Sequence, residues 1–375
     1  MAPDKFKGSL RAIEVAEAIA AGFKRVFPDA SYELVPVADG GDGTLDALVS
    51  ALGGREVETT VTGPNGAPVL ARYGLMSERG LAVVEMAQAS GLALLPPGTN
   101  DPMTATSRGT GELIAAALDA GAKRIIVAIG GSATNDAGTG ALAALGARFL
   151  DASRHELPPG GAALARLNRV DASALDARLH GVTIEIASDV TNPLCGPNGA
   201  SAIYGPQKGA TPDDVRELDA ALAQFASVAS ELTGRDIRNV PGAGAAGGFG
   251  GGFLALAGAQ LRPGADLVLD VLDFSKRLEG ADLVVTGEGR IDKQTLSGKA
   301  PYAVAHMAHA KGIPVVAVAG SVALSADDLE MMGIQSAVGI APPDMPVEEA
   351  MRRAAELTEA ASQELAASLS ALQKM

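Results

Sequence analysis

Apolar positions along the chain form short runs that alternate with helical stripes. Aliphatic and β-branched runs predict buried parallel strands at residues 32–37, 124–129, 182–187, 283–285 and 313–319. Apolar spacing of three to four residues predicts helices that include residues 13–26, 45–52, 106–120 and 347–372. This alternation predicts an α/β fold whose helices cover a mostly parallel sheet.

The strand pattern changes in the middle of the chain. Shorter, irregular β-like runs begin at residue 57 and include 69–73 and 81–85, separated by glycine and proline turns. The parallel-strand pattern of residues 32–37 returns only at residue 283. Because 375 residues exceed one ordinary core, we expect two domains, one of them built from both ends of the chain.

The chain begins with a polar loop where a doubly wound domain ordinarily has a strand. Only Met1 and Ala2 precede Pro3, so no strand is expected before this loop. We therefore expect that a short apolar strand is missing from the start of the sequence.

Composition and charge narrow the classes of partner. The formal net charge of −14 argues against nucleic acid, which requires clustered Lys and Arg. Cys195 is the only cysteine, which is typical of a reducing compartment. No uncharged apolar run reaches about 18 residues and no signal-peptide pattern opens the chain. We expect a cytoplasmic protein without a membrane partner.

The loop after residues 283–285 carries an unusual number of charged groups. Arg290 and Lys299 have side chains that bind anionic oxygens, while Glu288 and Asp292 suit a metal ion or a hydroxyl. A solvated connector is the alternative. Gly298-Lys299 lacks the spacing and the hydroxyl of a Walker A loop, so a bound nucleotide would need another kind of loop.

Two loops near the N-terminus carry similar groups. Asp4, Lys5, Lys7 and Ser9 are candidates for an anion site in which Ser9 caps the following helix; an ordinary N-cap with exposed lysines is the alternative. Asp39 and Asp42 lie among three glycines, where they would suit a cation or a ligand hydroxyl, although turn chemistry also explains them.

Two further loops follow predicted strands in the middle of the chain. The glycine-rich loop at residues 130–140 follows the strand at 124–129 and precedes a helix, the order that presents backbone amides to phosphate. Asp189 follows the strand at 182–187 and suits a general base or metal ligand, with an Asx-turn as the alternative. The glycines at 242–247 match a dinucleotide spacing but lack a preceding strand, so close helix packing explains them better.

Taken together, five motifs closely resemble the bacterial glycerate kinases. They are APDKFKGS at 2–9, PVADGGDGT at 36–44, IGGSATNDAGTG at 129–140, ASDVTNPLCGPNGA at 187–200 and TGEGRIDKQTLSGKAP at 286–301. The resemblance covers essentially the whole chain. The sequence departs from the family pattern in one respect: it does not show the short hydrophobic strand that family members usually carry before the first motif.

The resemblance implies a flavodoxin-like parallel-sheet domain at residues 1–60 and 270–375, with a second α/β domain inserted at 61–269. It also implies phosphorylation of D-glycerate by ATP with Mg²⁺, usually at O2 to give 2-phosphoglycerate, by a monomer or homodimer.

The resemblance also suggests roles for individual residues, because phosphoryl transfer requires positioning and charge neutralisation. Asp189 is the expected base, and Arg290, Lys299 and Lys7 are expected to hold the carboxylate and the transferring phosphate. Asp39, Asp42 and Glu288 are metal candidates. The remaining expected binding residues are Lys5, Ser9, Asp292, Gly130, Gly131, Ser132, Thr134, Asn135, Asp136 and Gly138, of which those at 130–138 would contact nucleotide phosphates.

Two other functions stay open. One is a sensor that binds a hydroxy acid without catalysis, although the export signal or basic DNA-binding helices typical of sensors are not found in the sequence. The other is a hydroxy-acid dehydrogenase that uses the glycine loop at 242–247. Tight binding of NAD without binding of ATP would favour the dehydrogenase.

Overall fold

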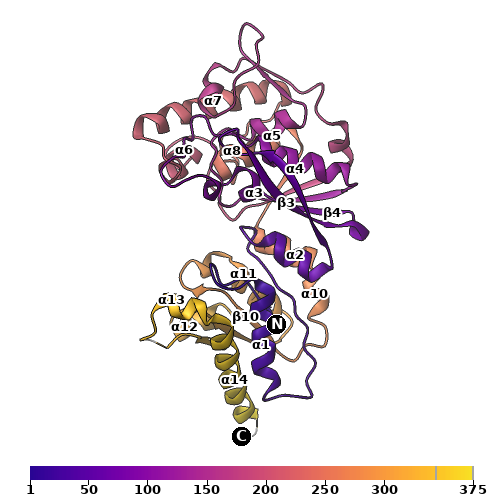
Figure 1. Cartoon of the computed structure of the whole chain (residues 1–375), viewed down its shortest axis with the longest axis vertical. Helices are drawn as coiled ribbons and strands as arrows, with labels where there is room; N and C mark the ends of the chain where they lie inside the picture. The colour runs from indigo at the N-terminus through magenta and orange to yellow at the C-terminus, as the bar shows by residue number, and fades with distance from the viewer. Residues whose placement is uncertain (343, 374–375) are drawn as a thin grey trace. The chain divides into compact units, whose positions relative to one another are not determined.

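The computed structural model describes residues 1–342 and 344–373, and the chain forms two compact units. Unit 1 comprises Met1–Gly53 and Pro263–Met375, and unit 2 comprises Gly54–Arg262. Figure 1 shows unit 1 built from the indigo start and the orange-to-yellow end of the chain. These limits fall a few residues before the domain boundaries expected near residues 60 and 270. Residues 374 and 375 of that expected range lie outside the described residues.

Unit 1 contains a four-stranded parallel sheet in the order β1-β10-β12-β14 and a two-stranded parallel sheet of β11 and β13. Its strands are β1 (Ala2–Pro3), β10 (Val284–Gly287), β11 (Arg290–Ile291), β12 (Val315–Ala319), β13 (Ser321–Val322) and β14 (Ser336–Gly339). Its helices are α1 (Ala12–Lys24), α2 (Thr44–Leu52), α9 (Gly264–Val271), α10 (Phe274–Arg277), α11 (Ala300–His309), α12 (Ala326–Met331), α13 (Val347–Arg352) and α14 (Ala354–Gln373).

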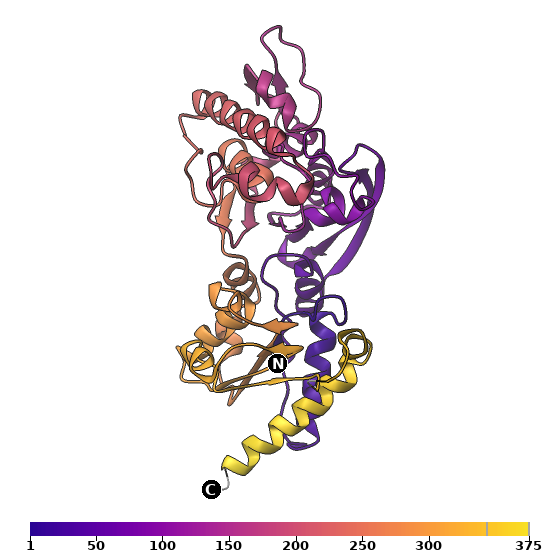
Figure 2. The ribbon, with the colours of Figure 1, turned by 90° about the vertical axis from the view of Figure 1, so that its left-hand side faces the viewer.

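The core of unit 1 joins the two ends of the chain. Val285, Val316 and Val318 of the sheet pack with the apolar stripe of α1 and with Leu357 and Leu365 of α14. Figure 2 shows indigo α1 beside yellow α14. The approach is close: a Cβ added to Gly22 of α1 would lie 2.3 Å from the carbonyl oxygen of Glu359. Segments far apart in the sequence therefore share one buried core.

Three expectations for unit 1 need correction. A strand does precede the first loop, because β1 pairs in parallel with β10. Residues 32–37 form no regular strand, although Val35 and Val37 donate backbone hydrogen bonds to Met1 and Pro3 at 2.8 and 3.0 Å. Pro3 has no N–H to return such a bond, so the ladder stays incomplete. The single helix expected at 347–372 is divided into α13 and α14.

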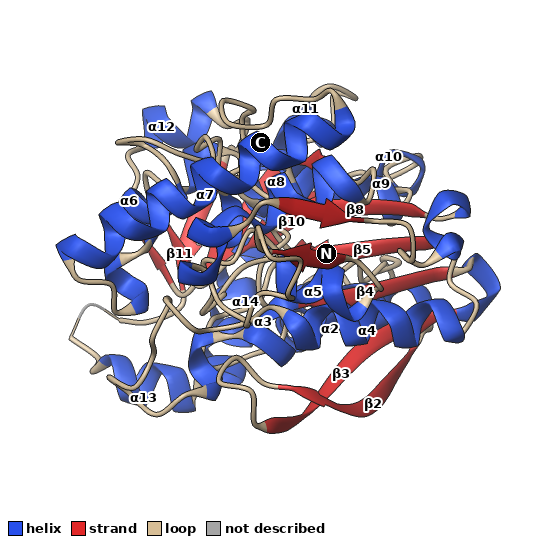
Figure 3. Cartoon of the chain, turned by 90° about the horizontal axis from the view of Figure 1, so that it is seen from above, coloured by secondary structure: helices blue, strands red, loops and turns tan. Residues whose placement is uncertain are grey.

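Unit 2 contains a six-stranded mixed sheet in the order β2-β3-β4-β5-β8-β9. Strands β4, β5, β8 and β9 are parallel, and β4, β5 and β8 lie side by side in Figure 3. The strands are β2 (Arg55–Thr62), β3 (Pro68–Met76), β4 (Leu81–Glu85), β5 (Arg124–Ala128), β6 (Arg148–Leu150), β7 (Arg169–Asp171), β8 (Thr183–Ala187) and β9 (Gln260–Arg262). The helices are α3 (Met86–Ser90), α4 (Arg108–Asp119), α5 (Thr139–Ala144), α6 (Ala200–Tyr204), α7 (Pro212–Thr233) and α8 (Ala245–Leu256).

The irregular runs at 57–61, 69–73 and 81–85 are confirmed as strands, and β2-β3-β4 is an antiparallel meander. The fold class is confirmed: a parallel-sheet α/β unit from both chain ends, and a second α/β unit between them. No helix in the described ranges is both long and apolar enough to cross a bilayer.

Candidate functional site

The sheet of unit 1 brings two polar loops to one edge. Strands β1 and β10 are parallel, with Pro3 opposite Gly287, so the loops that follow them leave the sheet together. They line a pocket of about 580 Å³. The predicted residues that meet in this pocket are Lys5, Lys7, Ser9, Asp39, Glu288, Arg290, Asp292 and Lys299.

Glu288 is the most buried of the predicted acidic residues in this pocket, with 7% of its surface exposed. Its Oε1 atom accepts a hydrogen bond of 2.6 Å from the Thr295 hydroxyl, and its Oε2 atom lies 3.9 Å from Nζ of Lys299. Burial raises the pKa of Glu288, while Thr295 and Lys299 act in the opposite direction. The site therefore holds a carboxylate that a further cation would stabilise.

Asp4, a candidate from the first loop that was given no specific role, also lines the pocket. Its Oδ1 atom accepts a 2.6 Å hydrogen bond from the backbone N–H of Lys5. Burial, followed by the nearby carboxylates of Asp39 and Glu288, raises its pKa well above the usual range. Its place in the polar loop after Pro3 is the signal that made it a candidate.

Arg290 is a basic residue of the pocket that pairs with a neighbouring carboxylate. Nε of Arg290 lies 3.3 Å from Oδ2 of Asp292, and the Arg290 side chain is 67% exposed. Arg290 is thus held loosely at the mouth of the pocket, where its guanidinium can still reach an anion.

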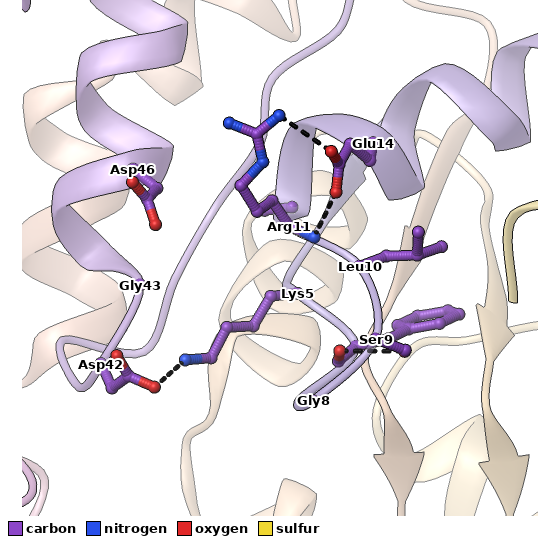
Figure 4. Close-up of a pocket in the computed structure, with 11 residues that line it drawn as sticks. Lys5, Gly8, Ser9, Leu10, Arg11, Glu14, Asp42, Gly43 and Asp46 are labelled. Atoms are coloured by element: carbon purple, nitrogen blue, oxygen red, sulfur yellow. Dashed lines mark hydrogen bonds and ion pairs between the residues drawn. The ribbon is translucent and has the colours of Figure 1, made fainter. Parts of the chain in front are cut away.

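Ser9 does not cap the following helix, contrary to expectation. Its hydroxyl donates to the carbonyl oxygen of Phe6 at 3.1 Å. The N-cap of α1 is Arg11, whose backbone N–H donates to the Glu14 carboxylate at 2.9 Å. Figure 4 shows these contacts at a neighbouring pocket of about 260 Å³.

The three predicted metal ligands do not form a chelating group. Asp42 lines the neighbouring pocket, where it forms an ion pair with Lys5 (Figure 4). Oδ1 of Asp39 accepts the Gly41 N–H at 3.0 Å. Among the residues that the structure describes, no three His, Cys, Asp or Glu side chains come together in a geometry that could hold a metal.

In unit 2, the loop after β5 is organised around a buried carboxylate. Asp136 accepts hydrogen bonds from the Ser107 N–H and hydroxyl at 2.9 and 2.8 Å, and from the amides of Gly138 and Gly140 at 3.1 and 3.2 Å. Burial raises its pKa and these donors lower it. The Gly138 and Gly140 amides therefore already have an anionic partner within the protein. Gly130 and Gly131 are the exposed part of this loop.

Lys208 supports the same loop from a distant part of the chain. Its Nζ donates to Oγ of Ser132 at 2.9 Å and to the carbonyl oxygen of Thr134 at 2.7 Å. The side chain is buried, and desolvation lowers its pKa to about 7 despite the opposing charge of Asp136. The predicted residue set omitted Lys208, because its partners are remote in sequence.

Asn135 and Thr134 complete this buried network. Asn135 donates from Nδ2 to Oγ of Ser201 at 3.0 Å, and both side chains are buried. Oγ1 of Thr134 and Oδ1 of Asn135 have no hydrogen-bond partner among the residues that the structure describes. These groups stiffen the loop rather than face solvent.

Asp189 lies just beyond the carboxyl end of β8 and is exposed. Strands β5 and β8 pair with Ala128 opposite Ala187, so the Asp189 segment and Gly130 leave the same edge of the unit 2 sheet. The residue before it, Ser188, donates its N–H to Arg262 at 2.9 Å. Asp189 is thus positioned by three neighbouring parallel strands.

Among the described residues, no strand comes directly before the glycines at 242–247. A Cβ on Gly247 would lie 2.1 Å from the carbonyl oxygen of Thr134, and Gly247 has a φ of +68°. Close packing therefore explains this glycine, and a dinucleotide fingerprint does not.

Charged loops at the carboxyl ends of parallel strands define an α/β enzyme that acts on small anionic molecules. Comparison with known proteins gives the particular family: residues 1–370 match the glycerate kinase family, to which this chain belongs.

Related proteins match over nearly their full length. The chain is 51% identical to glycerate kinase of Bacillus subtilis, covering 98% of this chain and 97% of the relative. It is 46% identical to glycerate 2-kinase of Escherichia coli, covering 98% of this chain and 97% of the relative. A crystal structure described as that of a candidate glycerate kinase 2 from Salmonella typhimurium LT2 is 47% identical, with a TM-score of 0.92 over 100% of this chain and 98% of that one.

Proposed function

We propose that this enzyme transfers the γ-phosphoryl group of ATP to O2 of D-glycerate. The observation that carries the proposal is the unit 1 pocket, where Lys5, Lys7, Arg290 and Lys299 lie with the carboxylates of Asp4, Asp39 and Glu288. Cations hold phosphate and carboxylate oxygens, and carboxylates hold the metal ion that accompanies ATP. The names of the relatives in Bacillus subtilis and Escherichia coli support glycerate as the acceptor and O2 as the position.

The carboxylates of this pocket suit Mg²⁺ in chemical type. Magnesium takes oxygen ligands, commonly one or two carboxylates completed by water and substrate phosphates. Burial raises the pKa values of Asp4 and Glu288, and the nearby charge of Asp39 raises both further. When bound, the metal would neutralise charge on the transferring phosphate. Asp39 and Glu288 are our candidates to hold it, because Asp42 is paired with Lys5.

The chain's own residues then have distinct roles. Lys7 and Lys299 hold oxygens of the transferring phosphoryl group, and the planar fork of Arg290 clamps the glycerate carboxylate. Clamping the carboxylate fixes which of two adjacent hydroxyls is presented. Asp189 accepts the proton of the O2 hydroxyl as the new P–O bond forms and ADP leaves.

The proposal is tested by measuring ADP formation from ATP with D-glycerate, and by coupling the product to enolase. Enolase consumes 2-phosphoglycerate directly but requires added phosphoglycerate mutase for the 3-isomer. We expect signal without mutase. Signal that requires mutase would overturn the O2 assignment, and no ADP with a panel of short hydroxy acids would overturn the kinase itself. NAD binding without ATP binding would instead favour a dehydrogenase. We also propose a cytoplasmic location.

A further inference from the structure

The unit 1 pocket is larger than glycerate and half of its wall is apolar. If each non-hydrogen atom of glycerate takes the volume that one water molecule occupies in the liquid, glycerate fills about 200 Å³. The pocket holds about 580 Å³, and its apolar lining side chains include Phe6, Ile340, Met345, Val347, Ala350 and Met351. A small, fully polar acid has nothing to place against such a wall. The pocket therefore suits a second, partly apolar molecule.

The apolar wall is exposed in a way that hydrophobic side chains usually avoid. Val347 is 73% exposed and Met351 is 39% exposed. They lie four residues apart on α13, so they share one face of the helix. Phe6, by contrast, is 3% exposed. A ligand that covers Val347 and Met351 would remove this apolar surface from water.

The wall is continuous with the cationic loop. Cε of Met351 lies 2.8 Å from the position that a Cβ on Gly8 would take, so Met351 reaches the loop that carries Lys5 and Lys7. Arg290 and Lys299 line the same pocket. The ligand that fits is therefore apolar at one end and strongly anionic at the other.

We infer that the wall formed by Phe6, Val347 and Met351 binds the purine base of the nucleotide, with its phosphates directed toward Lys5, Lys7 and Lys299. This inference rests on the proposed function, which supplies ATP as the donor. A purine is flat and apolar on its faces, and a triphosphate is the matching polyanion. Flexible Met side chains adapt well to such a ring. The site is distinct from the loop at residues 130–140, where Asp136 already occupies the Gly138 and Gly140 amides.

The test places a charge on the wall in the variant Val347→Asp. Because Val347 is exposed, folding should tolerate the change. We expect the Kd for ADP, measured by titration calorimetry, and the KM for ATP to rise about tenfold or more, since an unpaired carboxylate would be buried against the base. The KM for D-glycerate should change less than about twofold, which is typical of a site without a shared contact.

Two controls make the result specific. Met331→Asp alters an equally exposed hydrophobic side chain, 72% exposed on α12 and outside the pocket lining, and should leave every constant unchanged. Inorganic tripolyphosphate has no base, so its Kd should be the same for Val347→Asp and the parent protein, apart from weak charge repulsion.

Several outcomes would overturn the inference. They are an unchanged Kd for ADP in Val347→Asp, an equal loss of tripolyphosphate binding, a selective rise in the KM for D-glycerate, or a loss of self-association that shows a second copy covering the wall. The ADP titration needs no turnover. If the parent protein makes no ADP, the proposed function fails while the titration still decides whether the wall binds the base.

Discussion

Asp189 is the residue at which a catalytic role and a turn role predict different results. The change Asp189→Asn keeps the shape and removes the proton acceptor. We expect kcat to fall by about 10²–10⁴ with little change in the KM for D-glycerate, the loss typical of a general base. Asp171→Asn is the matched control, because Asp171 accepts the Ser173 N–H at 3.0 Å in an exposed turn of the same unit. An unchanged kcat in Asp189→Asn would return Asp189 to the turn role.

Lys208 carries a prediction about stability and pH. Its pKa falls from 10.5 to about 7 in the folded protein, chiefly through desolvation. Between these two pH values the unfolded chain binds the proton more strongly than the folded protein does. The free energy of unfolding therefore increases as pH rises from about 7, and the destabilisation caused by burying Lys208 is complete below that pH. Lys208→Met removes this dependence together with the hydrogen bonds to Ser132 and Thr134.

Urea unfolding at pH 7, 8 and 9 would measure the effect. We expect the difference in unfolding free energy, parent protein minus Lys208→Met, to increase with pH. Lys276→Met, which changes an exposed lysine, should give a difference that does not vary with pH. A constant difference for Lys208→Met would contradict the lowered pKa.

At the scale of elements, the pattern of apolar residues and the polar turn residues that bound it predicted most strands well. The runs that became β4, β5, β8, β10 and β12 are short, aliphatic and bounded by polar turns, so local pattern was sufficient. The pattern failed where a partner strand decides the outcome. Residues 32–37 have the composition of a strand, yet Pro3 on the neighbouring β1 cannot complete the ladder.

The site residues divide in the same way. Charged groups directly after strands were found from the sequence, because parallel strands carry their loops to one sheet edge. Asp4 was a candidate from its loop, although the two-residue strand before it was not predicted. Contacts across long sequence separations were not predictable: Lys208 reaches Ser132 over 76 positions, and Ser107 reaches Asp136 over 29. Such pairs depend on tertiary packing that local periodicity does not encode.

At the scale of the whole molecule, the two units have separate hydrophobic cores. The cluster that contains Val285, Val316 and α14 lies entirely within unit 1. The cluster that contains Ile125, Ile186 and Phe249 lies entirely within Gly54–Arg262. Separate cores are the property that allows a domain to fold without its neighbour. That unit 2 is an independently folding insertion is a prediction.

The residues 54–262, produced alone, should therefore fold. The chain enters this unit just before β2 and leaves it after β9, and these are the two edge strands of its sheet, so cutting there breaks no strand pairing. The fragment is also within the usual size of a domain, about 50–250 residues. We expect a cooperative thermal transition by circular dichroism. A shorter fragment, 54–181, lacks β8 and β9 and leaves β5 as an uncovered edge, so it should show no such transition. If both fragments lack a transition, the unit depends on the rest of the chain and the insertion model is wrong.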